Sequence, residues 1–550
     1  MWLVLGVMSE LEKIAKQAYP PLIGINSITR IIDACWNGKA ATDVPVMFKD
    51  VPSTIIDKET LALIQVVDLH AAMDHAATAV GSATLFRSLM RPLTSLDLIL
   101  AKQESVRELE SNDKLRNAIG EYLKEFQKGE NDLFKFLNGC IGPIGVYRES
   151  KAATKAGKRM ADAVKNIPMP ESPYARFLID EIRNFEGSPA YRLMRGPIWR
   201  TFRGLKSKED VGYFTPRLKF RYHRFTLDTY GFLLPIAGAV GGMKMGMISG
   251  EVASAISFGL SVFGAYWALL YGGIAKPRID LDKVIDPLRK KTLRDLPFIG
   301  AIDAVGKLDE LMSFIAYAKA TPHPTALPQI TRDTPHYFLA KDMTNTIQSK
   351  NNPSYVPNDV NLVDAKLTLI TGPNSGGKTT FCKTVVQEQL KGQIGCYVNA
   401  SRAKMAIADR VYYQAPRFDS LQDEEGRFGT ELKRTREIFY STTPQSLVIL
   451  DELAEGTTLE EKMQHSKTVL NGFYDIGNNT LLVTHNHQLV DYFNGEGKGQ
   501  CLQVQFDGDA PTHKVVQGIS RVSHADRVAK KIGFSAEDID AHLIKQGHRK

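Results

Sequence analysis

Apolar side chains recur at spacings of three and four residues through most of residues 9–180. An α-helix turns once every 3.6 residues, so this spacing places the apolar positions on one face of a helix. The pattern therefore predicts amphipathic helices that pack against one another through that face. It is plainest at Leu61, Ile64, Leu69, Leu85, Leu89, Leu93, Ile99, Val106 and Leu109.

Residues 229–273 have a different pattern, with two uncharged runs separated by a short segment that contains Lys244 and Glu251. The second run, residues 252–273, is long enough to cross a hydrocarbon core of about 30 Å at a rise of about 1.5 Å per residue. Basic residues flank both ends, and the positive-inside rule then predicts a two-pass transmembrane hairpin whose ends are both cytoplasmic. A buried helical hairpin inside a soluble domain is the alternative interpretation.

The helical pattern returns at residues 282–321 and ends at a proline-rich linker, Pro322–Pro328. From about residue 346, short runs of β-branched residues alternate with helical stretches, which is typical of an α/β domain. The sequence therefore predicts a multidomain chain. Its expected parts are an N-terminal helical segment at 1–54, a helical core at 55–228, a transmembrane hairpin at 229–273, the rest of the helical core at 274–345 and an α/β domain at 346–550.

The net charge of the chain comes from one segment. The 550 residues include 69 Lys and Arg against 61 Asp and Glu, a formal net charge of +8, and the hydrophobic fraction of 43% excludes a fibrous or fully disordered chain. Residues 191–225 hold ten basic and two acidic residues, and 10 − 2 = 8 equals the whole excess. Aromatic residues interleave with these charges, which suits a nucleic-acid backbone or an anionic lipid surface. A solvated helix face is the third interpretation.

A phosphate-binding loop follows a predicted buried strand at Lys366–Thr371. The sequence Gly-Pro-Asn-Ser-Gly-Gly-Lys-Thr matches the pattern GxxxxGK[ST] and leads into a predicted helix, so backbone N–H groups and the helix N-terminus can surround phosphates. We expect Lys378 to contact the β- and γ-phosphates of ATP and the Thr379 hydroxyl to bind Mg²⁺. The predicted ATP-binding residues are Gly372, Pro373, Asn374, Ser375, Gly376, Gly377, Lys378, Thr379 and Thr380.

Two further predicted strands end in residues suited to ATP hydrolysis. The strand at 446–450 is followed by Asp451 and Glu452, and the strand at 480–484 is followed by His485. We expect Asp451 to bind Mg²⁺ and Glu452 to act as the base that orients the attacking water. His485 is expected to sense the γ-phosphate. The predicted catalytic residues are therefore Lys378, Glu452 and His485.

These motifs together resemble the ATPase domain of the MutS family of DNA mismatch-repair proteins. Two helical segments also resemble the family, at the start of its core domain and at the end of its lever helices. The segments that carry the resemblance are 78–93, 307–314, 355–359, 367–381, 394–398, 408–411, 451–458 and 518–524.

The resemblance implies an α-helical core and lever domain joined to an ABC-type P-loop ATPase domain that uses ATP and Mg²⁺. It also implies DNA binding in mismatch repair or recombination and a dimer that forms through the ATPase domains. His513 falls where the family has a side chain that contacts adenine.

The sequence departs from the family in three places. The family's mismatch-reading domain is expected to be missing, and none of the 25 Phe residues is followed by x-Glu, the motif that wedges into the base stack. Gly426 falls where the family places a Ser that reaches the γ-phosphate of the partner subunit. The apolar segment 229–273 lies where relatives carry a DNA-gripping clamp, so we expect a membrane anchor there instead.

Two functions are consistent with these features. One is a DNA-binding MutS-type ATPase, and the other is a membrane-tethered ATPase switch that acts on a protein partner without DNA. A transporter ATPase is disfavoured because the sequence has no LSGGQ-like signature. The five cysteines have no CxxC spacing, which suits a reducing cytosol. We therefore expect a cytoplasmic ATPase, dimeric through its ATPase domains and anchored to the cytoplasmic membrane.

Overall fold

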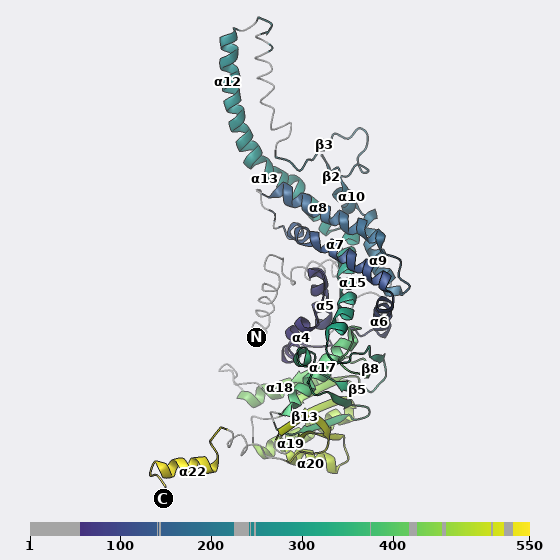
Figure 1. The fold of residues 1–550 in the computed structure, drawn as a ribbon, viewed down its shortest axis with the longest axis vertical. Helices are drawn as coiled ribbons and strands as arrows, with labels where there is room; N and C mark the ends of the chain where they lie inside the picture. The colour runs from purple at the N-terminus through teal and green to yellow at the C-terminus, as the bar shows by residue number, and fades with distance from the viewer. Residues whose placement is uncertain are drawn as a thin grey trace.

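The computed structural model of the chain is elongated, with the helix α12 at one end, the sheets of the C-terminal part toward the other and helices between them (Figure 1). It describes residues 55–549 apart from 140, 142–144, 225–240, 242–243, 247–248, 374–375, 417–425, 454–457, 508–509 and 522–531. The predicted helical segment at 1–54 and most of the first run of the predicted hairpin lie outside the described residues.

The helical core is built around α15 (Leu296–Ala320), which is buried along most of its length. α15 packs against α5, α6 and α9, and its buried charged residues have partners there, such as Arg87 of α5 for Asp303 and Lys102 of α6 for Glu310. The helices around it, with two short 3-10 turns, are α3 (Lys58–Leu63), α4 (Val66–Met73), α5 (Ala79–Met90), α6 (Leu96–Ser111), α7 (Asp113–Leu137), α8 (Val146–Ala163), η2 (Val164–Asn166), α9 (Pro173–Asn184), η3 (Phe185–Gly187) and α10 (Pro189–Arg195).

The two helical segments that resemble the MutS family touch each other in this core. Thr78 caps α5, where its Oγ1 accepts a hydrogen bond from the backbone N–H of Gly81 at 3.0 Å and donates one to Asp309 Oδ2 at 2.6 Å. Glu130 of α7 accepts hydrogen bonds from the backbone N–H groups of Ala79 and Val80 at 2.9 and 2.7 Å. Two buried carboxyl groups therefore satisfy the free N–H groups at the start of α5.

The second run of the predicted hairpin forms part of one long helical stretch, Gly250–Leu293, of 44 residues. Only 6% of its most apolar window is buried, so the alternative of a buried hairpin does not fit this described run. By length and composition, it is the one helix in the described part of the chain that could cross a membrane. Its successive parts are α12 (Gly250–Trp267), the π-helical η4 (Ala268–Ala275), α13 (Lys276–Asp280), the π-helical η5 (Leu281–Ile285) and α14 (Asp286–Leu293).

A small antiparallel sheet lies before the long helix in sequence. Its strands β1 (Trp199–Thr201), β2 (Gly204–Lys206) and β3 (Leu218–Lys219) have the order β2-β1-β3. β2 contacts α14, which places the sheet beside the end of the long helix that joins the core.

The C-terminal part contains a six-stranded sheet of order β13-β12-β7-β11-β10-β9. All neighbours are parallel except β12 and β13. The central strands β7, β10 and β11 are almost wholly buried, as expected for a parallel sheet covered on both faces. The strands are β7 (Leu367–Thr371), β9 (Val411–Gln414), β10 (Leu447–Asp451), β11 (Asn479–Val483), β12 (Gln500–Asp507) and β13 (Ala510–Gln517), and the helices are α16 (Thr346–Ser349), α17 (Lys378–Gln393), α18 (Gly426–Ser441), α19 (Leu459–Ile476), α20 (His487–Gly495) and α22 (Ala536–Lys545).

A second, four-stranded sheet has the order β4-β8-β5-β6. Its strands are β4 (Gln329–Thr331), β5 (Phe338–Met343), β6 (Asn358–Asn361) and β8 (Arg402–Ala406). β4 and β5 lie before residue 346, where the sequence predicts the start of the α/β domain. Both strands pair with β8, which follows α17, so they belong to the same sheet as strands of that domain. The chain is thus multidomain and mixes helices with sheets, as the sequence predicts.

Candidate functional site

The loop after β7 lies between the carboxyl end of a buried strand and the N-terminus of α17. Lys378 is the first residue of α17 and is only 1% exposed, and its Nζ donates a hydrogen bond to the carbonyl oxygen of Gly372 at 2.5 Å. Burial lowers the pKa of Lys378, while Asp451 and Glu452 act in the opposite direction. The ammonium group is therefore held over the loop by backbone oxygen and nearby carboxylates. Asn374, in the middle of the loop, and the adjacent Ser375 lie outside the described residues.

Two glycines in this loop are required by its geometry. Gly377 caps α17 with a φ of 91°, a left-handed conformation that side chains disfavour. A Cβ atom on Gly376 would lie 2.9 Å from Cγ2 of Val504 in β12, closer than such atoms can approach. The loop therefore packs closely against the neighbouring strand and has no side chains at these two positions. This leaves its backbone N–H groups accessible, as phosphate binding requires.

Asp451 lies across from this loop at the end of β10. The Thr379 hydroxyl donates to Asp451 Oδ2 at 2.9 Å, and the Tyr413 hydroxyl donates to the same oxygen at 3.2 Å. Burial and the charge of Asp451 raise the pKa of Tyr413, so this phenol remains a proton donor. Three side chains from β9, β10 and α17 thus meet at one carboxylate oxygen.

The oxygens of Thr379 and Asp451 fit a magnesium ion. Hydroxyl and carboxylate oxygens are the hard ligands that Mg²⁺ prefers, and Mg²⁺ usually takes its other ligands from water and substrate phosphates. Among the described residues, no cluster of three or more His, Cys, Asp or Glu side chains could hold a metal by itself. The two residues are therefore suited to a metal that is shared with a bound nucleotide.

Glu452 and His485 lie together at the adjacent strand ends. The register pairs Asp451 of β10 with Val483 of β11, and the Glu452 N–H donates to the Val483 carbonyl at 2.9 Å. His485 Nε2 is 3.7 Å from Glu452 Oε1, and both side chains remain partly exposed. Glu452 has a φ of 61°, a left-handed conformation that commonly marks functional sites. Its carboxylate is thus held beside an imidazole where solvent can reach it.

A cavity of about 420 Å³ opens beside the first turn of α17. Its lining includes Gly377 and Thr380 from the loop and helix, Tyr355 before β6, and His513 from β13. The Nδ1 atom of His513 lies 3.7 Å from the position of a Cβ on Gly377. The backbone oxygen of His513 accepts a hydrogen bond from Asn358 Nδ2 at 3.1 Å, which fixes the hairpin against the cavity. His513 therefore stands next to the phosphate loop.

Sequence reasoning missed several residues of this region. It did not single out Tyr413, which contacts Asp451, or Asn358, which holds His513. The segment 355–359 carried a signal only as part of the family resemblance. Gly426, expected at the partner-facing position, is the first residue of α18, and residues 417–425 before it lie outside the described residues.

The strand, glycine loop, lysine and strand-end carboxylates lie together at one edge of the parallel sheet of an α/β domain. Residues 368–544 match the family model described as MutS domain V. This C-terminal part of the chain is therefore similar to domain V of the MutS family.

Similar proteins include the DNA mismatch repair protein MSH3 of Coccidioides immitis, 31% identical over 269 residues, which are 45% of this chain and 23% of that protein. The probable DNA mismatch repair protein Msh6 of Drosophila melanogaster is 30% identical over 43% of this chain and 20% of its own length. The DNA mismatch repair protein MutS of Haloquadratum walsbyi is 27% identical over 45% of this chain and 26% of its own length. The matches thus span about a quarter of these relatives or less.

Proposed function

We propose that this chain is a MutS-type ATPase that binds ATP with Mg²⁺, hydrolyses it and acts on DNA in mismatch repair or recombination. The observation that carries the proposal is the convergence of Lys378, Thr379, Asp451 and Glu452 on one edge of the sheet. The matched domain and the names of its relatives support the DNA role.

Each side chain has a distinct part in the proposed reaction. Lys378 exchanges its hydrogen bond to Gly372 for the β- and γ-phosphates, and the N–H groups of the loop bind the remaining phosphate oxygens. Bound Mg²⁺, held by Thr379 and Asp451, supplies positive charge that offsets the charge of the phosphates. Glu452 accepts the proton of the attacking water, and His485 orients that carboxylate and contacts the γ-phosphate. The cavity beside His513 receives the adenine base.

We infer that the complete site forms between two copies of the chain. The N-terminus of α18 at Gly426 presents backbone N–H groups that can bind the γ-phosphate of a partner even without a serine side chain. Closure of this interface on ATP, and its release after hydrolysis, would then move the helical core, which is joined to α17 through α15.

The long apolar helix supports a second part of the proposal, an anchor in the cytoplasmic membrane through residues 229–273. Its exposed side chains include Phe258, Phe263 and Leu269, at 74%, 59% and 69% exposure. An exposed apolar surface of this length is costly in water and favourable in lipid. A membrane tether acting on a protein partner without DNA is the alternative, and the DNA response of the ATPase distinguishes the two.

The decisive experiment measures ATP binding and hydrolysis by the full chain with and without duplex DNA. Glu452→Gln should keep ATP binding and lose turnover by roughly 10²-fold or more, because it removes the proton acceptor. Glu460→Gln, an exposed acid at the start of α19, is the matched control and should hydrolyse ATP normally.

Normal turnover in Glu452→Gln would refute the role of Glu452. An ATPase rate indifferent to DNA, without salt-dependent DNA binding, would favour the tether alternative. A carbonate wash of cell membranes tests the anchor separately, since a peripheral protein is released and an inserted one is retained.

A further inference from the structure

The small β-sheet β1–β3 is firmly attached to the end of the long helix that joins the core. Ile198 and Leu205 are 3% and 2% exposed, and Lys291 Nζ of α14 donates to the carbonyl oxygen of Leu205 at 2.6 Å. Phe220, just after β3, stacks on Tyr147 of α8 with their ring centroids 6.5 Å apart. The sheet therefore has a fixed position relative to the apolar helix.

The turn, the loop and the last strand of this sheet expose large apolar side chains. Tyr213 and Phe214, in the loop between β2 and β3, are 99% and 100% exposed, and Phe202 in the β1–β2 turn is 94% exposed. Leu218 of β3 is 71% exposed. Two adjacent aromatic rings fully in water, with a third on the neighbouring turn, form a surface that gains free energy when it enters an apolar phase.

Exposed cations lie on the same strands, turn and flanking segments as these apolar residues. The two acids of the segment, Glu209 and Asp210, lie within 3.7 Å of Arg192 or Arg195 and so compensate the basic residues nearest the core. In the part of the chain that the structure describes, no carboxylate pairs with the five exposed cations of the sheet and its flanks. These five are Arg200, Arg203, Lys208, Lys219 and Arg221. Arg217 is a sixth exposed cation of this region, but its guanidinium lies over the Trp199 ring, 4.8 Å from the ring centroid.

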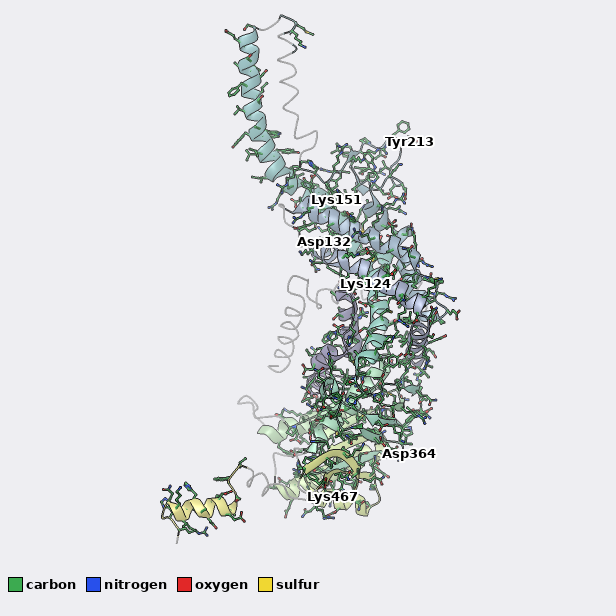
Figure 2. All side chains as sticks on the ribbon, in the orientation of Figure 1. Lys124, Asp132, Lys151, Tyr213, Asp364 and Lys467 are labelled. Carbon is green, nitrogen blue, oxygen red and sulfur yellow. The ribbon has the colours of Figure 1, made fainter. Side chains whose placement is uncertain are left out.

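The sheet lies at the same end of the molecule as the apolar helix. Along the longest axis of the molecule, Tyr213 is level with the lower part of α12 (Figure 2). The apolar stretch ends nearby at Lys276, which pairs with Asp280 at 3.1 Å, and Trp267 stacks on Tyr271 just before it. Aromatic residues followed by paired charges are typical of the level where a membrane helix leaves the hydrocarbon.

A membrane interface fits this surface better than duplex DNA does. Both offer phosphates to the five cations, but only a bilayer offers an apolar layer directly beneath its phosphates for Tyr213 and Phe214. We propose that the β1–β3 sheet is a second membrane contact, in which the 207–217 loop enters the interfacial layer of an anionic leaflet and the five cations bind lipid phosphates. This proposal rests on the proposed membrane anchor, and it assigns the basic segment to lipid instead of DNA.

A fluorescent probe on the loop tests this contact in the full chain. Thr215→Cys, next to the aromatic pair, is labelled with an environment-sensitive nitrobenzoxadiazole group after the other accessible cysteines are changed to serine. Thr468→Cys, an exposed threonine of α19 in the ATPase domain, is the reference position. The protein is inserted in nanodiscs of phosphatidylcholine, with or without phosphatidylglycerol, and also mixed with duplex DNA in detergent.

The expected result is a blue shift at position 215 in the anionic nanodiscs, weaker in neutral ones, with none at position 468. Tyr213→Ser/Phe214→Ser should abolish the shift, and neutralising the five cations with Gln should make it require more anionic lipid, since each cation contributes roughly fivefold to partitioning. Neutralising Lys114 and Lys124, exposed cations of α7, should change nothing.

Absence of a shift in the anionic nanodiscs would overturn the proposal, and so would a shift that appears with DNA but not with lipid. If the chain fails to insert, the anchor itself is wrong, and the same probe with added anionic vesicles tests the sheet separately. A shift with vesicles then keeps the surface contact without the anchor, whereas its absence overturns both.

Discussion

The hydroxyl oxygen of Tyr317, near the end of α15, lies 3.0 Å from Nζ of Lys391 in α17. Lys391 is completely buried, and its Nζ also lies 2.8 Å from Glu388 and 2.8 Å from the Thr346 hydroxyl. Burial opposes its charge, but Glu388 and Tyr317 raise the pKa of Lys391. Since α17 begins at the phosphate-loop lysine, this polar cluster joins the proposed ATP site to the central helix of the core.

Tyr317→Phe should weaken the effect of ATP on α15. The substitution keeps the ring and removes the hydroxyl, while Lys391 retains Glu388, so we expect a stability cost of only about 1 kcal/mol. Hydrogen exchange along α15, measured with and without ATP, should show a change several-fold smaller than in the unmodified chain. Nucleotide affinity itself should stay within about twofold, because no group of the phosphate loop is altered.

Tyr337→Phe is the control for that measurement. The Tyr337 hydroxyl, between β4 and β5, lies 2.6 Å from the hydroxyl of Thr331 at the end of β4, so its hydrogen bond is to β4 and not to α15. It should leave the ATP-dependent exchange of α15 unchanged. A full response in Tyr317→Phe would mean that the core senses the nucleotide by another route.

Asp451→Asn should make ATP hydrolysis depend on much higher Mg²⁺ concentrations. Asparagine keeps the size of the side chain and an oxygen for the Thr379 and Tyr413 hydroxyls, but it loses the negative charge that attracts the ion. We expect the Mg²⁺ concentration for half-maximal activity to rise about tenfold or more. Metal titrations at saturating ATP measure this.

A matched comparison is Asp475→Asn, which changes an exposed acid near the end of α19. Its Mg²⁺ dependence should equal that of the unmodified chain. If Asp451→Asn also shows no change, the assignment of Asp451 as a metal ligand is wrong.

The sequence predicts the strand, the glycine loop and the helix around Lys378 well, because these parts are local. The strand, the glycine turn and the first residues of the helix all lie within one short segment, from Lys366 to Thr380. Each of the three has its own residue pattern. The strand-end acids Asp451 and Glu452 follow the same logic, because parallel strands bring their carboxyl ends to one edge. The helical core and the mixed fold class are predictable for a similar reason, since apolar periodicity is a local property.

Other features depend on contacts between distant segments and carry no local signal. β5 and β8 pair with each other although α17 lies between them in the sequence. The sequence of neither strand alone therefore predicts the second sheet. Asp309 and Glu130 cap α5 from helices 231 and 51 residues away in sequence. The sequence likewise carries no local signal that Lys391 is buried, because its burial and its contact with Tyr317 depend on packing against α15.

The two carboxyl groups at the start of α5 should make the core less stable as the pH rises. Burial raises the pKa of Glu130 from 4.5 to about 7 and that of Asp309 from 3.8 to about 6. The folded state therefore holds these protons more tightly than the unfolded chain. Their stabilisation is complete below about pH 4 and is lost as the pH rises through about 6 to 7. About two pKa units correspond to roughly 3 kcal/mol per carboxyl.

Glu130→Gln should remove its share of this dependence, because the amide does not titrate. Hydrogen exchange of the α5 amides between pH 5 and 8, corrected for the intrinsic rate, gives the opening free energy of the helix. The opening free energy should decrease between pH 5 and pH 8 in the unmodified chain. The decrease should be smaller by roughly 3 kcal/mol in Glu130→Gln. Glu121→Gln on the exposed face of α7 should retain the full decline. An identical decline in Glu130→Gln would show that other groups titrate in this range.

His513→Asn should weaken ATP binding through the base and not through the phosphates. His513 lines the cavity beside Gly377 and has a φ of 59°, a conformation that asparagine adopts readily and alanine does not. The substitution therefore removes the imidazole ring without adding backbone strain, and we expect roughly tenfold weaker ATP binding from the lost contact with adenine. Tripolyphosphate, which has no base, should compete with equal strength in both proteins. His542→Asn on the exposed α22 should leave both ligands unaffected. If tripolyphosphate also binds more weakly to His513→Asn, the histidine supports the phosphate loop, and the cavity is not the adenine site.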